Sequence, residues 1–179
     1  MIIPNYNAHP IRKAAEDELL NAYRTHLMAE RNLATLTVRN YMDDLKPFLQ
    51  YLTIEGIGPS NWLVNLKDFV SRKGSSNVNQ EYRRLVRSYV SWLLQERKTN
   101  PGKRNEGEGY VRASTARCLA SLRSFFRYLI PEGHLPQATI WSRGSQSMGR
   151  LAPKLSKRLP QTVYQQEIKA LLDKAKGSP

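Results

Sequence analysis

Arginines spaced by small residues are the feature of this sequence best suited to chemistry with a polyanion. Four of them, and no acidic residue, occur between positions 112 and 131: Arg112, Arg117, Arg123 and Arg127. Alanine and serine between them let a helix approach a groove closely, while the guanidinium groups reach phosphates or guanine edges. An ordinary solvated helix face mixes charge signs, so this segment favours binding to duplex DNA.

Residues 37–50 hold a second and more mixed set of polar side chains. Asn and Gln can pair bidentately with adenine, and Arg with guanine. We expect contacts from Thr37, Arg39 and Asn40, with Lys46 further along the same face. Asp43 and Asp44 are expected to keep part of that face away from a polyanion. Taken alone, this segment fits a plain polar face better than a binding site.

Residues 142–158 carry five basic side chains and no acidic one, among Ser, Gly and Pro, which is typical of a linker. Such a linker can follow a phosphate backbone or act only as a flexible tether, and the two interpretations are compatible. The complete set of candidate DNA-binding residues is Thr37, Arg39, Asn40, Lys46, Arg112, Ser114, Thr115, Arg117, Ser121, Arg123, Arg127, Lys154, Lys157 and Arg158.

Other chemistry finds little support in the sequence. The single cysteine, Cys118, excludes an internal disulfide and a cysteine-based zinc site. His9, His26 and His134 lack metal-ligand spacing, and no Walker-type phosphate loop occurs. No nucleophile is paired with a base. We therefore expect no catalytic residue, metal, cofactor or small-molecule ligand in this segment, which would not itself be an enzyme.

The charge balance points to the same partner. The chain of 179 residues has a net charge of +13, and such an excess repels itself unless an anion balances it. Residues 1–57 have a net charge of −1, residues 58–110 of +5 and residues 111–179 of +9. No signal peptide and no apolar stretch long enough to cross a bilayer is found. We expect a soluble, cytoplasmic protein that associates with the nucleoid and not with a membrane.

Apolar periodicity predicts an all-α fold in which these polar residues stand on helices. The expected helices are residues 14–32, 37–52, 60–73, 77–97 and 114–130, with one more from Thr162. Thr35 or Thr37 should cap the second, and Asn77 with Gln80 should form a capping box on the fourth. Pro47 should bend the second helix and face away from its apolar stripe. Residues 98–109 should form a mobile polar loop.

These elements predict a small orthogonal helical bundle with appended segments. We expect a tail at 1–12, a DNA-binding domain at 13–135, a basic linker at 136–160 and one helix of a further domain at 161–179. No internal repeat, heptad array or alternating strand pattern is found.

Three segments, in this order, resemble tyrosine recombinases of the phage integrase family, in particular Xer-like members. The first resembles the start of the family's core-binding, SAM-like domain, the second its last core helix, and the third the linker and opening helix of its catalytic domain. The matching residues are 30–37, Tyr41, Asp44, Leu45, Phe48, Tyr51 and Leu52; then Ser114, Thr115, Arg117, Leu119 and 122–129; then 153–155, 157–160, Glu167, Ile168, Leu171 and Leu172.

The resemblance implies a clamp on double-stranded DNA, with helices 37–52 and 114–130 crossed at the major groove. It also implies other recombinase protomers as partners in a tetrameric synapse on DNA, and cleavage through a 3′-phosphotyrosine formed by a catalytic domain. That domain would begin near Gln161, so its motif residues match no position here, and the chain is expected to be a fragment that binds without cleaving.

Residues 57–111 are longer than the family pattern, which makes 58–76 and 98–109 insertions of unassigned role. Two other functions remain open from the residues alone. One is a helical protein–protein interaction module whose basic faces bind acidic partners, and the other is an RNA-binding helical domain.

Overall fold

A computed structural model describes residues 10–58, 61–96, 98–99, 107–142 and 150–154 of the chain. Within these residues the fold is all-helical, as predicted, apart from one pair of two-residue strands. The helices are α1 (Pro10–Thr25), α2 (Thr35–Ile54), α3 (Trp62–Ser71), α4 (Val78–Gln95) and α5 (Arg112–Leu129), with the short elements η1 (His26–Glu30), η2 (Ser75–Asn77) and η3 (Thr139–Trp141). The strands are β1 (Lys98–Thr99) and β2 (Gly107–Glu108).

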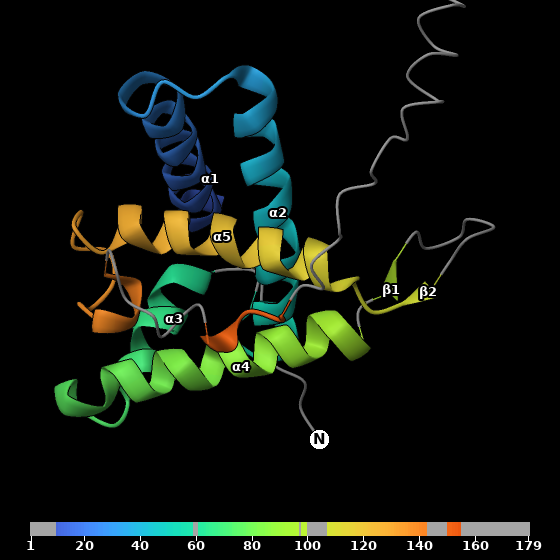
Figure 1. The fold of residues 1–179 in the computed structure, drawn as a ribbon. Coiled ribbons are helices and arrows are strands. Elements are labelled where there is room, and N and C mark those ends of the chain that lie inside the picture. Colours follow the sequence, from blue (N-terminus) through green and yellow to red (C-terminus); the bar gives the residue numbers. More distant parts are fainter. Residues whose placement is uncertain (1–9, 59–60, 97, 100–106, 143–149, 155–179) are drawn as a thin grey trace, which may run out of the picture.

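Helix α5 is the centre of the arrangement, because other helices lie on both sides of it. Figure 1 shows α1 and α2 side by side at one end of the molecule, with α5 crossing them and α4 running along its other side. Helix α5 contacts α2, α4 and η3, while α3 packs on α4. The helices at 37–52 and 114–130 are thus crossed, as the family resemblance implies.

Aromatic rings fill the space between the helices. Phe126 of α5 packs edge-on against Phe48 of α2 and Tyr82 of α4, with ring centroids 5.8 and 5.5 Å apart. Its ring also stacks on Trp141 of η3 at 4.0 Å. All of these rings are almost fully buried. Since truncation of such a ring costs about 3–5 kcal/mol, this cluster fixes how the helices cross.

The packed body extends past the boundary expected at residue 135. Ile140 and Trp141, which fall within the predicted linker, are buried in the core. Asn79 of α4 holds this segment in place, since its Oδ1 accepts hydrogen bonds from the Thr139 hydroxyl and the Ile140 amide, both at 3.1 Å. This short apolar segment, which shows no helical periodicity, is therefore part of the bundle.

Three local predictions about the helices are wrong. Pro47 is buried in α2 and does not face away from the core. Helix α2 begins at Thr35 with Ala34 as its N-cap, so neither Thr35 nor Thr37 caps it. Asn77 occupies the N-cap position of α4 as expected, but it makes no side-chain cap hydrogen bond, and its amide nitrogen donates back to the Lys73 carbonyl oxygen at 2.8 Å. Sequence cues for caps do not register such competing local acceptors.

The strands β1 and β2 lie within the segment predicted to be a polar loop. They pair antiparallel, with Lys98 opposite Glu108 and Thr99 opposite Gly107. Gly109 follows with a φ of +74°, and a Cβ there would collide with the Leu94 carbonyl oxygen. Only glycine fits this return of the chain toward α5.

Candidate nucleic-acid interface

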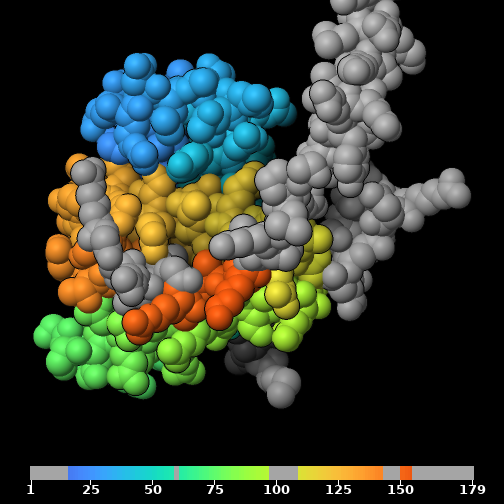
Figure 2. Space-filling model, viewed as in Figure 1, coloured from blue at the N-terminus to red at the C-terminus, as the bar shows by residue number. Residues whose placement is uncertain are grey.

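The exposed side of α5 presents arginines among small side chains, as the sequence predicts. Its positions recur every three or four residues, so they share one face of the helix. We call this face the α5 ridge; it consists of Ala113, Ala116, Arg117, Ala120, Arg123, Ser124 and Arg127, all exposed or half-buried. Arg112 is exposed and Ser114 half-buried at its start. In Figure 2 the surface of α5 lies between α1–α2 and the segments that follow α5.

Arg117 forms an ion pair with a buried carboxylate of α2. Its Nη1 lies 2.8 Å from Asp44 Oδ1, and the Asp44 side chain is only 4% exposed while that of Arg117 is 55% exposed. Ser121 donates a hydrogen bond to Asp44 Oδ2 at 2.9 Å, and Cys118 Sγ lies 3.7 Å from Oδ1. One carboxylate of α2 thus meets three side chains of α5, at the point where the two helices cross.

The environment of Asp44 leaves its charge incompletely compensated. Burial raises the pKa of Asp44 above its ordinary value, and the Ser121 hydrogen bond, the Arg117 charge and Cys118 oppose that rise. The carboxylate orients Arg117 with one guanidinium nitrogen. The other N–H donors of that planar group stay available on the exposed side.

Thr115 and Ser121, two of the predicted contacts, lie inside the molecule. Thr115 has no exposed surface, and its hydroxyl donates to the Val111 carbonyl oxygen at 3.3 Å. Ser121 is 3% exposed and serves Asp44. We therefore correct the predicted interface by leaving both out. The stripe that α5 buries is wider than its apolar residues alone indicate.

Arg123 and Arg127 stand one turn apart on the α5 ridge and differ in their partners. Arg127 donates from Nε to the Trp141 carbonyl oxygen at 2.7 Å and from Nη2 to that of Ser142 at 2.8 Å. It therefore fastens the segment after η3 to α5. Burial, and then the Arg127 charge, lower the pKa of Arg123. Two like charges at this spacing make an added anion favourable.

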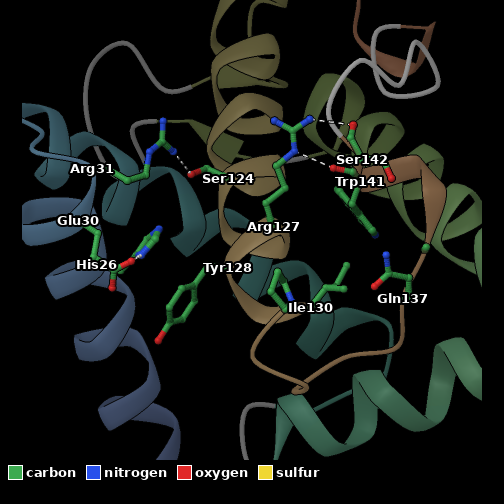
Figure 3. Close-up of a pocket in the computed structure, with 12 residues that line it drawn as sticks. His26, Glu30, Arg31, Ser124, Arg127, Tyr128, Ile130, Gln137, Trp141 and Ser142 are labelled. Carbon is green, nitrogen blue, oxygen red and sulfur yellow. Dashed lines mark hydrogen bonds and ion pairs between the residues drawn. The ribbon is translucent and has the colours of Figure 1, made fainter.

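A hollow of about 610 Å³ adjoins the second half of the α5 ridge. Figure 3 shows Arg31 and Arg127 on opposite sides of it, with Ser124 between them. Arg31 Nη1 donates to the Ser124 hydroxyl oxygen at 2.9 Å, which joins the segment after η1 to α5. The hollow thus joins α5 to the α1–α2 end of the molecule, and its lining carries both the two arginines and the exposed carboxylate of Glu30.

The predicted contacts on α2 are more weakly supported. Arg39, Asn40 and Lys46 are exposed, and Thr37 is half-buried. Asp43 lies between the two basic side chains, 2.6 Å from Lys46 Nζ and 3.9 Å from Arg39 Nε. The Lys46 hydrogen bond is the main cause that lowers the pKa of Asp43. Local ion pairs therefore offset much of the positive charge on this face.

Of the predicted linker contacts, the structure describes only one. Lys154 is exposed, whereas Lys157 and Arg158 lie outside the described residues, as does the helix expected from Thr162.

The roles of Asp44 and Arg31 differ from those predicted from the sequence. Asp44 was expected on the exposed face with Asp43, yet it follows Tyr41 by three residues and precedes Phe48 by four. That spacing places it on the apolar side of the helix. This spacing is the feature of the sequence that could have predicted a buried carboxylate with a partner. No comparable signal marks Arg31, because its partner Ser124 is distant in the sequence.

Among the described residues, no group of three His, Cys, Asp or Glu side chains could hold a metal ion. Within the same residues, none of the helices is long and apolar enough to cross a membrane.

Comparisons with known proteins agree with the resemblance drawn from the sequence. Residues 20–63 match the family model described as phage integrase, N-terminal SAM-like domain. The tyrosine recombinase XerC of Myxococcus xanthus is 30% identical over 155 residues, which cover 87% of this chain and 39% of that protein. XerC of Halalkalibacterium halodurans is 24% identical, over 90% of this chain and 41% of the relative. XerD of Shewanella oneidensis is 26% identical, over 87% and 39%.

No solved structure gives a significant match. The chain spans about two fifths of the length of the curated relatives that it matches. The residues matched by the family model include the end of α1, η1 and all of α2. Asp44 of α2 is among them. The chain therefore contains a segment that matches the phage integrase N-terminal SAM-like domain, and over most of its length it is similar to the tyrosine recombinases XerC and XerD.

Proposed function

We propose that this chain is the DNA-binding N-terminal module of a site-specific tyrosine recombinase, and that the α5 ridge is its main contact with duplex DNA. The observation that carries the proposal is Arg117, presented on a helix face without acidic residues and oriented there by the buried Asp44. Arg123 and Arg127 continue the positive surface along the same helix.

The shape of the α5 ridge suits the major groove, which admits one α-helix. Alanines at positions 113, 116 and 120 keep the helix surface low, so its backbone can come close to the bases. Arginines from the same face can then reach guanine edges or the flanking phosphates. Arg39 and Asn40 at the start of α2 would add contacts beside the crossing point, and Lys154 would contact the backbone further along.

The module itself would bind DNA and leave it intact. In this proposal a catalytic domain joined on the C-terminal side cleaves and rejoins the strands through a phosphotyrosine, as the family resemblance implies; the relatives are named tyrosine recombinases. Other protomers of the same recombinase would be its protein partners on DNA, and it would act in the bacterial cytoplasm.

A salt titration of binding to a short fluorescent duplex tests the proposal. If six to eight phosphates are contacted, log K should fall with log salt at a slope of about −5 to −7. Arg117→Ala and Arg123→Ala should each weaken binding, whereas Lys67→Ala, which removes an exposed charge from α3, should change it little. Circular dichroism of each variant establishes that it is folded.

Two results would contradict the proposal. A flat salt titration would show that phosphates contribute little, and unchanged affinity in both arginine variants would remove the α5 ridge from the interface. Competition with duplex RNA separates an RNA-binding function, since the deep, narrow major groove of A-form RNA does not admit a helix. Retention on an acidic protein without retention on DNA would indicate a protein-binding module.

A further inference from the structure

Helix α4 presents a second basic surface, which the α5 ridge does not include. We call it the α4 face; it consists of Lys73, Ser76, Gln80, Arg83, Arg84, Arg87 and Ser88. All seven are exposed, and together they line a hollow of about 710 Å³ along the helix. Every one of these side chains can donate a hydrogen bond, which suits an anionic partner.

Glu81 also lines this hollow, but its buried carboxylate offsets only part of the positive charge. Glu81 is only 1% exposed, and its carboxylate lies 2.7 Å from Arg72 Nη2 and 3.1 Å from Lys73 Nζ. Two cations therefore balance one buried carboxylate beneath the surface. The exposed positions of α4 carry three arginines and no acidic side chain.

The α4 face is separated from the α5 ridge by packed structure. η3 contacts both α4 and α5, and Asn79 fastens it to α4 through Thr139 and Ile140. In Figure 2 the segments that follow α5 lie between the surface of α5 and that of α4. A single DNA groove that receives the α5 ridge would therefore not contact the α4 face.

The spacing of the arginines fits a polymer of phosphates better than one small anion. Arg87 lies one helical turn beyond Arg83 and Arg84, so the cations are spread over about 5–6 Å of helix axis. A DNA strand places one charge about every 3.4 Å along its axis. The hollow also runs on past the arginines to Ser76 and Gln80.

We propose that the α4 face is a second phosphate-binding surface, which holds a DNA segment other than the one at the α5 ridge. The proposal rests on the proposed function, because it takes the first segment to lie at the α5 ridge. The module would thereby bring two duplex segments together. At the second segment it would contact only the phosphate backbone, because the α4 face offers charged side chains and not a helix inserted into a groove.

A bridging assay with the full chain tests this. One duplex is immobilised on beads and a second, labelled duplex is free; label recovered on the beads measures how well one protein holds both. Arg84→Gln/Arg87→Gln should lose about tenfold or more of the recovered label while keeping single-duplex affinity within about twofold. The salt slope of the bridging step should become shallower by about 2, one unit for each phosphate contact removed.

The variant Arg117→Gln/Arg123→Gln is the matched control, because it removes the same charge from the α5 ridge. It should weaken single-duplex binding itself. If the α4 variant bridges as well as the wild type, the second surface is not on α4, and bridging through a protein dimer would give that result. If the wild type binds one duplex and never bridges two, or retains an acidic peptide through Arg84 and Arg87 instead, the proposal is overturned. In each of these cases the single-duplex titration still decides the proposed function separately.

Discussion

Two buried carboxylates, each paired with arginine, do different things in this molecule. Asp44 lies where α2 crosses α5, and Glu81 lies where the end of α3 meets α4. Burial is the largest influence on both. It leaves the pKa of Asp44 raised, whereas hydrogen bonds from Arg72 and Lys73 outweigh it and lower the pKa of Glu81. Glu81 joins the end of α3 to α4 through ion pairs that compensate its charge, and we call this a closed junction. Asp44 instead orients one arginine that faces outward.

The difference follows from where the partners come from. Arg72 and Lys73 are adjacent in the segment after α3, so both reach the same carboxylate and together compensate its negative charge in full. The partners of Asp44 are one arginine and two uncharged side chains of α5. Because Arg117 is 55% exposed, solvent screens its attraction to the buried Asp44, and we take the main consequence of this ion pair to be the orientation of Arg117.

The largest expected effect is a loss of stability when both cations that pair with the buried Glu81 are removed. Arg72→Met/Lys73→Met leaves a carboxylate buried without a cation, which should lower the free energy of unfolding by about 3–5 kcal/mol. Urea unfolding followed by circular dichroism measures it. Adding Glu81→Gln to that variant removes the stranded charge and should restore most of the loss. A triple variant as unstable as the double variant would show that the cost arises from packing and not from charge.

The next effect concerns DNA binding. Arg117→Gln should weaken binding to a short duplex by about ten- to a hundredfold, which corresponds to about 1–3 kcal/mol for one well-placed arginine contact. Its stability should change much less than that of the Glu81 junction, because Asp44 keeps its bond to Ser121. Fluorescence anisotropy and urea unfolding of the same variant give both numbers. A large loss of stability with unchanged affinity would reverse the roles assigned to the two carboxylates.

How far the sequence predicted these two regions depends on how local the determinants are. The helices and the arginines of the α5 ridge follow from periodicity and spacing, which are local properties. Ser121 is buried because it hydrogen-bonds to Asp44 of α2, and Thr115 is buried as well, so α5 buries a wider stripe than its apolar residues show. Trp141 lies in the core because η3 closes over Phe126. Such contacts join residues far apart in sequence, and no single-helix pattern contains them.

The dependence of Arg117 on Asp44 gives a smaller and sharper prediction. Asp44→Asn keeps the size of the side chain and an oxygen for Ser121, but it removes the charge that orients the guanidinium group. DNA affinity should fall about three- to tenfold, which corresponds to about 0.7–1.4 kcal/mol, the net contribution of one ordinary hydrogen bond. In the Arg117→Gln background the same change should cost nothing further, because interacting residues are not additive. Equal losses in both backgrounds would mean that Asp44 acts on the fold and not through Arg117.

The smallest effect is on the pH dependence of stability, and it has opposite signs at the two carboxylates. Glu81 has a folded-state pKa below its ordinary 4.5. Its stabilising contribution is therefore present above that pH and is lost as pH falls through the folded-state value. Asp44 has a folded-state pKa above its ordinary 3.8. Its contribution is present below that pH and is lost as pH rises through the folded-state value.

Urea unfolding from about pH 3 to pH 7 separates the two contributions when each variant is subtracted from the wild type. Subtracting Glu81→Gln should give a difference that grows with rising pH, and subtracting Asp44→Asn one that shrinks. Both changes conserve shape, so differences that do not vary with pH report packing alone. If the two differences sloped the same way, both carboxylates would be compensated alike. Asp44 would then be a second closed junction, and the assignment of Arg117 as an outward-facing contact would lose its physical basis.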